Sequence, residues 1–184
     1  MGIIRNILAA RRMIKEAEAE AKKYKEMTEE EFYALDDDMF YEGVQAIIYA
    51  ETICLEPEEC LESIGGALRT FYILDYFDME MQNGGLCQFF VNSSRAVAPY
   101  VGEALKEIGA DEYYNLYHSF CEENQIDLTE LDSYSIERLE DYAEQLQRQP
   151  FDEFDDAYYA LYEKEPLCNK MAEYMKKQEI GREI

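Results

Sequence analysis

Residues 83–94 read NGGLCQFFVNSS, and this stretch says most about the fold. Gly84 and Gly85 can adopt positive φ, and Asn83 tolerates it, so we expect a tight corner between two helices here. After the corner the spacing predicts a short helix. Its apolar face consists of Leu86, Phe89 and Phe90, and Gln88 and Asn92 form a polar pair one turn apart. The stretch therefore predicts a packed helix–helix corner that carries amide groups.

The order NGG, QFF and NS resembles the small acidic DNA-mimic protein family. The likeness continues upstream in DMEMQ (78–82) and downstream in ALKEIGA (104–110) and FDEFDDAYYALY (151–162), and it spans residues 28–180. The chain departs from the family pattern at Leu86 and Cys87. The family motif comprises Asn83, Gly84, Gly85, Gln88, Phe89, Phe90, Asn92 and Ser93.

The resemblance implies an all-helical domain. For one branch of the family it also implies an acidic surface that imitates DNA and occupies a DNA-binding protein. We expect the motif residues to be structural, with Asn83, Gln88 and Asn92 satisfying backbone groups freed where the helices meet. Ligand binding at this corner is the alternative.

Composition indicates one folded acidic domain. Its 184 residues are 48% hydrophobic, which is enough for a sizeable core. The 41 Asp and Glu against 17 Lys and Arg give a net charge of −24, which argues against direct binding to nucleic acid. Sixteen Tyr and nine Phe rule out a disordered acidic tail, because such tails bury little apolar surface.

The charge divides the chain into a basic arm, residues 1–27, and an acidic domain, residues 28–184. The arm holds seven Lys and Arg against four Glu. Two acidic blocks, residues 28–68 with twelve carboxylates and residues 111–163 with sixteen, form the candidate anionic surface. An acidic run within each block supplies the candidate partner-binding residues: Asp36, Asp37, Asp38, Glu42, Asp152, Glu153, Asp155 and Asp156. Tyrosines among the later acids could serve as rigid anchors for a partner, namely Tyr113, Tyr114, Tyr158, Tyr159 and Tyr162.

Helical spacing dominates the chain, and no long β-alternating segment is present, so we predict an all-α fold with a long N-terminal helix. In the arm, apolar residues follow a heptad seam that could pack along a partner helix or form a homodimer: Ile3, Ile7, Ala10, Ile14, Ala17, Ala21 and Tyr24.

Helix boundaries follow from local signals. Thr28 and Glu31 form a capping box before a second helix that Gly43 could bend, and Pro57 begins a central helix that runs to Asn83. Later helices are expected from Ser93 or Ser94 to Gly109, from Asp111, from Ser135 to Gln149, from Asp152 and from Pro166, with a loop over 123–133.

Residues suited to catalysis or metal binding are few. His118 is the only histidine, and a Cys-His pair with Cys87 or Cys121 lacks a third orienting group. The five cysteines show no metal-ligand spacing or disulfide framework, and no phosphate-binding glycine loop occurs. We therefore expect no enzyme, no cofactor and no metal.

The arm lacks a secretory signal, and no run is long and apolar enough for a membrane span, so we expect a cytoplasmic protein. The leading hypothesis is an acidic decoy that occupies the DNA-binding surface of a regulator or another nucleic-acid-binding protein. One alternative is an immunity-type protein, or another protein-binding module, that neutralises a basic partner. The other is a small-ligand binder or enzyme in which the Asn83–Asn92 corner and His118 line one pocket.

Overall fold

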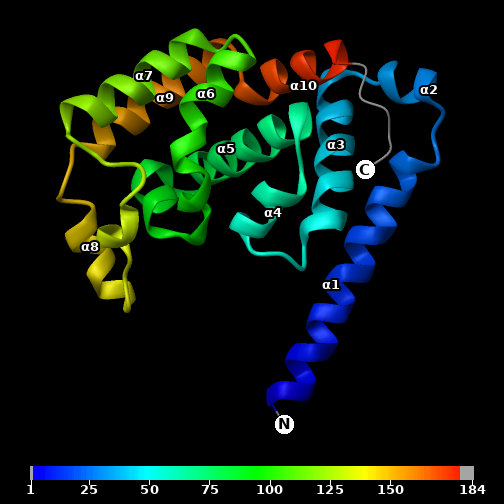
Figure 1. The fold of residues 1–184 in the computed structure, drawn as a ribbon, viewed down its shortest axis with the longest axis horizontal. Helices are drawn as coiled ribbons and strands as arrows, with labels where there is room; N and C mark the ends of the chain where they lie inside the picture. The colour runs from blue at the N-terminus through cyan, green and yellow to red at the C-terminus, as the bar shows by residue number, and fades with distance from the viewer. Residues whose placement is uncertain (1, 179–184) are drawn as a thin grey trace.

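The computed structural model describes residues 2–178, with side chains from residue 9 onward except at position 139, and this part of the chain is helical and contains no strand (Figure 1). The predicted all-α class is confirmed. In chain order the segments are α1 (Gly2–Lys25), α2 (Glu29–Tyr33), α3 (Asp37–Thr52), α4 (Pro57–Ser63), α5 (Gly66–Val91), η1 (Ser93–Val97), α6 (Ala98–Glu107), α7 (Asp111–Glu123), η2 (Leu131–Tyr134), η3 (Leu139–Asp141), α8 (Tyr142–Gln145), α9 (Phe151–Lys164) and α10 (Leu167–Lys177).

The long helix α5 lies at the centre of the fold, as the sequence predicted. It packs against α3, α6, α9, α10 and η1, and Figure 1 shows it crossing the middle of the molecule. Its side chains are therefore buried on most sides, among them Phe71, Leu74, Phe77 and Met81.

Two predicted helices are each split in the structure. The helix from Thr28 breaks after α2, because Asp36 accepts a hydrogen bond from the backbone N of Met39 and so caps a new helix, α3. The helix from Pro57 stops after Ser63, and α5 begins at Gly66, whose φ is +57°. The capping box of Thr28 and Pro57 at the start of α4 are confirmed.

Helix α1 packs on α3 through the second half of its seam. Ala17, Ala21 and Tyr24 are buried, whereas Ala10 is exposed, and Ile3 and Ile7 lie outside the residues whose side chains are described. Gly43 lies inside α3 and allows a close approach, since a Cβ there would be 2.7 Å from Phe32 and 2.8 Å from Tyr24. Helix α3 continues through Gly43.

The predicted helix from Ser135 to Gln149 is also wrong. Only the short segments η3 and α8 form there. Arg148 instead donates to the carbonyl oxygen of Ser133 at 2.7 Å and lies over the Tyr134 ring at 4.2 Å. These tertiary contacts replace the helix that spacing alone suggested.

Within residues 2–178, no helix combines the length and apolar character needed to cross a bilayer.

Candidate acidic interface

The corner at Gly84 and Gly85 interrupts α5, as predicted. Gly85 has φ +78°, and a Cβ there would overlap Oδ2 of Asp155. Gly84 has an extended φ of −166°, and a Cβ there would overlap Oε1 of Gln88. Gly85 is therefore favoured by its backbone conformation, and a Cβ at either position would displace a side chain that takes part in the corner, Gln88 or Asp155.

Asp155 of α9 caps the helix that restarts after the corner. Its Oδ1 accepts a hydrogen bond from the backbone N of Leu86 at 2.9 Å. Burial raises the pKa of Asp155 to about 6, although the bond from Leu86 lowers it. Asp155 was expected on the partner-binding surface, but it is half-buried and bound within the fold.

The amides of the corner bind one buried carboxylate, Glu80. Nε2 of Gln88 donates to Glu80 Oε2 at 2.8 Å, and Nδ2 of Asn92 donates to Oε1 at 3.0 Å and Oε2 at 2.9 Å. The hydroxyl of Ser94 donates to Oε1 at 2.7 Å. Glu80 is only 5% exposed, so these hydrogen bonds compensate for its lost hydration.

This geometry corrects two expectations. Gln88 and Asn92 satisfy a carboxylate rather than freed backbone groups, and Asn83 is exposed. Neither Ser93 nor Ser94 caps a long helix, because Ser94 binds Glu80 and residues 93–97 form η1. Phe89 and Phe90 are fully buried, in agreement with the predicted apolar face.

His118 lies away from this corner. It is exposed on α7, stacks on Tyr114 with ring centroids 5.1 Å apart, and lies 3.3 Å from Glu122 Oε1. It lines a small cleft of about 200 Å³ with Lys106 and other residues of α6 and α7, and none of the corner's amides lines that cleft.

Cys87 and Cys121, the two cysteines considered as partners of His118, lack the properties of a nucleophile. Burial raises the pKa of the Cys121 thiol to about 12 and that of Cys87 to about 11, which disfavours the reactive thiolate. No group of three or more potential metal-ligating side chains occurs in the part of the chain that the structure describes.

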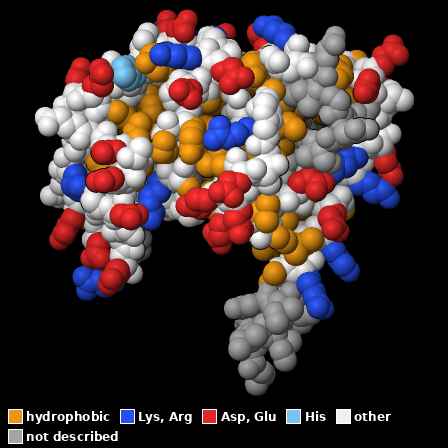
Figure 2. Space-filling model, viewed as in Figure 1, with side chains coloured by type: hydrophobic (Ala, Val, Ile, Leu, Met, Phe, Trp, Pro, Cys, Tyr) orange, Lys and Arg blue, Asp and Glu red, His pale blue; other side chains and the backbone are white. Residues whose placement is uncertain are grey.

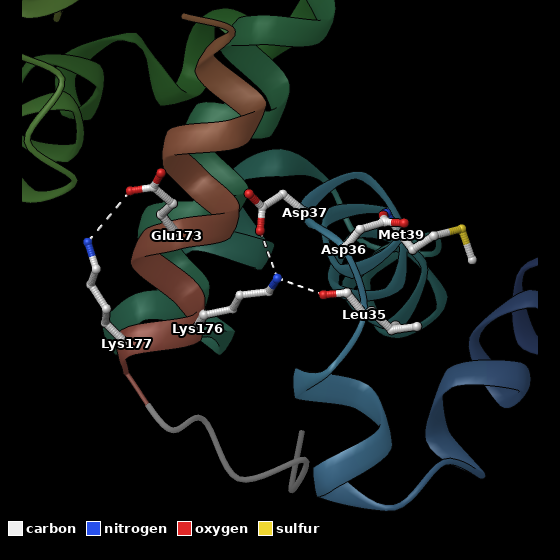
Figure 3. A network of polar contacts seen from close by, with 7 residues as sticks. All are labelled: Leu35, Asp36, Asp37, Met39, Glu173, Lys176 and Lys177. Atoms are coloured by element: carbon white, nitrogen blue, oxygen red, sulfur yellow. Dashed lines mark hydrogen bonds and ion pairs between the residues drawn. The ribbon is translucent and has the colours of Figure 1, made fainter.

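The first acidic run, Asp36 to Glu42, is partly used within the fold. Asp36 caps α3, and Asp37 Oδ1 lies 2.7 Å from Nζ of Lys176 on α10, which also donates to the carbonyl oxygen of Leu35 at 2.7 Å (Figure 3). Asp38 and Glu42 are exposed. This run therefore offers a partner less uncompensated charge than its sequence suggested.

The second run lies on α9 and continues on its neighbour α7. Tyr113 OH donates to the carbonyl oxygen of Glu165 at 2.8 Å, and the rings of Phe120 and Phe154 are 5.0 Å apart, so the two helices are antiparallel. Their exposed carboxylates form what we call the α7–α9 ridge: Asp111, Glu112, Glu122, Glu123, Asp152, Glu153, Asp156 and Glu163. Lys164 is the only Lys or Arg in the two helices.

The two acidic runs do not form one surface. The N-terminus of α3 and that of α9 lie toward opposite ends of the longest axis (Figure 1). In Figure 2 the pale-blue His118 marks α7; carboxylates lie on one side of it, and a Lys or Arg side chain lies directly on the other. The acids of α7 lie within the predicted acidic block, residues 111–163, although they were not among the partner-binding residues named individually.

The tyrosines near the ridge are mostly part of the core. Tyr113 and Tyr158 are 3% and 1% exposed, and the Tyr158 hydroxyl donates to Asp78 Oδ1 at 2.5 Å. Tyr114 and Tyr162 are half-buried, and Tyr159 is exposed. Of the five proposed anchors, Tyr113 and Tyr158 are thus unavailable to a partner.

Comparison with protein families gives a match to the family described as DMP19-like protein, over residues 62–178. The match covers more than half of the chain, including the corner and the α7–α9 ridge, but begins later than the expected residue 28. Neither the curated proteins nor the solved structures include a match to this chain.

Proposed function

Since the chain belongs to the DMP19-like protein family, we propose that it is a non-catalytic protein that imitates DNA and binds the DNA-binding surface of a regulator or another nucleic-acid-binding protein. The α7–α9 ridge is the surface that makes this contact.

The charge density of the ridge is the observation that carries the proposal. A helix of 14 residues such as α9 is ~21 Å long. Eight exposed carboxylates and Lys164 give the ridge a net charge of −7. That is about one net negative charge per 3 Å, more than half the density of duplex DNA, which carries one per ~1.7 Å.

The carboxylates of the ridge gather at its two ends. Because the helices are antiparallel, Glu122 and Glu123 share one end with Asp152, Glu153 and Asp156, and Asp111 and Glu112 share the other with Glu163. Ten positions of α7, ~15 Å of helix, separate Glu112 from Glu122. A protein surface that binds phosphates at two points about that far apart would therefore meet fixed carboxylates at both.

The fold holds α7 and α9 rigidly. Aromatic packing joins α7 to α9 at the Phe120 end, and the Tyr158 hydroxyl joins α9 to Asp78 on the central helix. A partner would consequently order few backbone segments on binding, which lowers the entropic cost.

The proposal is tested by affinity capture from the native lysate. The wild-type chain should retain a basic DNA-binding protein at low salt and release it at high salt, because such contacts weaken as counterions compete. The ridge variant Asp152→Asn, Asp156→Asn, Glu163→Gln should lose this protein.

A matched variant controls for net charge. Glu29→Gln, Glu30→Gln, Glu58→Gln removes the same number of exposed carboxylates from α2 and α4, away from the ridge, and should capture the protein as the wild type does. Equal loss in both variants would show that total charge matters rather than the ridge. A partner that is indifferent to salt and to added duplex DNA would contradict mimicry. A basic partner that salt releases but duplex DNA does not displace would favour an immunity-type interaction.

A further inference from the structure

A groove of about 890 Å³ lies between α1, α3 and α5. Large apolar side chains line it and remain solvent-exposed, namely Met13 (53%), Tyr49 (45%) and Met79 (49%). Figure 2 shows hydrophobic side chains gathered where α1 leaves the rest of the molecule. Neighbouring apolar side chains left in contact with water are typical of an interaction site.

The groove is also acidic. The described residues that line it include the carboxylates of Glu16, Glu20, Glu42 and Asp75 and no Lys or Arg. Beside the groove, Arg12 pairs with Glu16 and Lys23 with Glu20. Asp75 accepts hydrogen bonds from Tyr41 and Gln45, so among the described residues of the groove Glu42 carries the charge that no ion pair offsets. An occupant should therefore combine an apolar face with positive charge.

The first part of α1 has this chemistry. Residues 2–15, which we call the arm tip, contain four basic residues and no carboxylate, and their apolar residues continue the heptad seam. Figure 1 shows the beginning of α1 projecting away from the other helices, and Ala9, Ala10 and Arg11 to Met13 are exposed. The seam is covered by α3 only further along, at Ala17, Ala21 and Tyr24.

We propose that the arm tip of one copy of this chain occupies the groove of a second copy, and that the second copy does the same in return. The contact is isologous, with two α1 helices running antiparallel across a two-fold axis. Met13 belongs to both the arm tip and the groove lining, as expected for a residue close to that axis. Arg11 flanks the seam and faces the acidic walls of the partner groove, whereas Arg12 lies on the outer face of α1 and pairs with Glu16 at 2.7 Å.

A second copy fits better than an unstructured basic peptide, because the arm tip is already helical and loses little conformational entropy on docking. Reciprocal docking also doubles the apolar area buried per dimer. The dimer uses a surface different from the α7–α9 ridge, so the dimer proposal is tested independently of the proposed DNA mimicry.

A charge swap tests the contact. One variant, Arg11→Glu, gives the flank of the arm tip's seam the sign of the groove; the other, Glu20→Lys, Glu42→Lys, gives the groove the sign of the arm tip. Each alone should raise the dimer dissociation constant at least about tenfold in sedimentation equilibrium, relative to wild type. Their equimolar mixture should restore dimers, because both grooves then face an arm tip of opposite charge.

Apolar contacts are tested with matched substitutions of exposed residues. Ala10→Glu places a carboxylate on the seam and should weaken the dimer at least about tenfold, whereas Ala19→Glu, on the opposite face of α1, should leave it unchanged. Met79→Glu in the groove should act like Ala10→Glu, and Met39→Glu at the start of α3 should act like Ala19→Glu. Circular dichroism confirms that each variant is folded.

A monomeric wild-type chain overturns the proposal, as does a dimer that tolerates both Ala10→Glu and Met79→Glu, or a charge-swapped mixture that stays monomeric. Phosphatidylserine vesicles provide the remaining outcome. If the chain is monomeric in solution and Ala10→Glu releases it from vesicles, the arm tip binds an anionic membrane instead, and the proposal is wrong.

Discussion

Nδ2 of Asn92 donates to both carboxylate oxygens of Glu80, although twelve residues and a sharp corner separate the two side chains. The bonds close the corner, because Glu80 precedes Gly84 and Asn92 ends the helix that follows. Gln88 and Ser94 complete the set, so one buried carboxylate ties together both halves of α5 and η1.

Glu80→Gln should therefore destabilise the protein by about 2–3 kcal/mol. A glutamine offers one acceptor oxygen where three donor side chains converge, and the unmatched buried donors lose their partners. Urea unfolding measures the loss, and Glu103→Gln on the exposed face of α6 should change the free energy of unfolding by less than about 0.5 kcal/mol. Equal changes in the free energy of unfolding for Glu80→Gln and Glu103→Gln would show that the hydrogen bonds to Glu80 do not stabilise the corner.

Gly85→Ala should destabilise the protein by about 2–4 kcal/mol, since φ +78° with ψ −173° is a backbone region essentially confined to glycine and an added Cβ would overlap Asp155. Gly109 provides the comparison for a positive φ alone. It has φ +73°, but a Cβ added there would meet no atom within 4 Å, so Gly109→Ala should cost only about 1 kcal/mol. Similar losses in thermal or urea unfolding would mean that neither the extended backbone at Gly85 nor the approach of Asp155 adds to the cost of positive φ.

Lys176→Met should cost about 1–2 kcal/mol, because Nζ binds Asp37 and the Leu35 carbonyl between α2 and α3 and lies 5.2 Å from the Phe40 ring centroid. The neighbouring Lys177 is the natural comparison. It is exposed and pairs only with Glu173 among the described residues, at 3.7 Å, so Lys177→Met should be nearly neutral (Figure 3). A neutral Lys176→Met in chemical unfolding would contradict the role assigned to this contact.

Mild acidification should stabilise the protein. Burial raises the pKa values of Asp75 and Asp155 to about 6, above the ordinary 3.8, so the folded state binds protons more tightly than the unfolded state. The stability these groups contribute is present in full below pH ~4 and is lost as pH rises through ~6. The Tm should therefore rise between pH 7.5 and pH 5.

Asp75→Asn separates this effect from the general relief of charge repulsion. The variant keeps an oxygen that can accept from Tyr41 and Gln45 but cannot titrate, so part of the rise in Tm should disappear. Asp111→Asn, at an exposed position on α7, should leave the pH profile unchanged. A wild-type Tm that falls steadily from pH 7.5 to pH 5 would show that the buried carboxyl groups do not control this range.

Local signals predicted much of the fold. The glycine corner, the capping box at Thr28 and the helix start at Pro57 depend on nearby residues, and all three occur in the structure. The breaks before α3 and α5 also had local signals: Asp36 can cap a helix, and Gly65 and Gly66 can end one. These breaks were not predicted because the helical spacing of apolar residues continues across both positions. The helix expected at 135–149 failed because Arg148 makes contacts with Ser133 and Tyr134 that spacing cannot reveal.

The site was harder to predict than the fold. Glu80 could not be distinguished from the other carboxylates, because its partners converge only after the chain turns at Gly85. Asp155 had the same ambiguity, since its cap on Leu86 joins residues 69 positions apart. The grouping of acids on α7 and α9 depends on helix packing, whereas their number was evident from the sequence.

Competition with duplex DNA tests the central claim most directly. The DNA-binding protein captured by the wild-type chain is bound to a fluorescent duplex that it recognises, and the chain is titrated in while anisotropy is followed. We predict that the wild type displaces the duplex and that Asp152→Asn, Asp156→Asn, Glu163→Gln does so far more weakly, with the Glu29, Glu30, Glu58 variant equal to wild type. Formation of a stable complex that contains chain, protein and duplex together would contradict DNA mimicry.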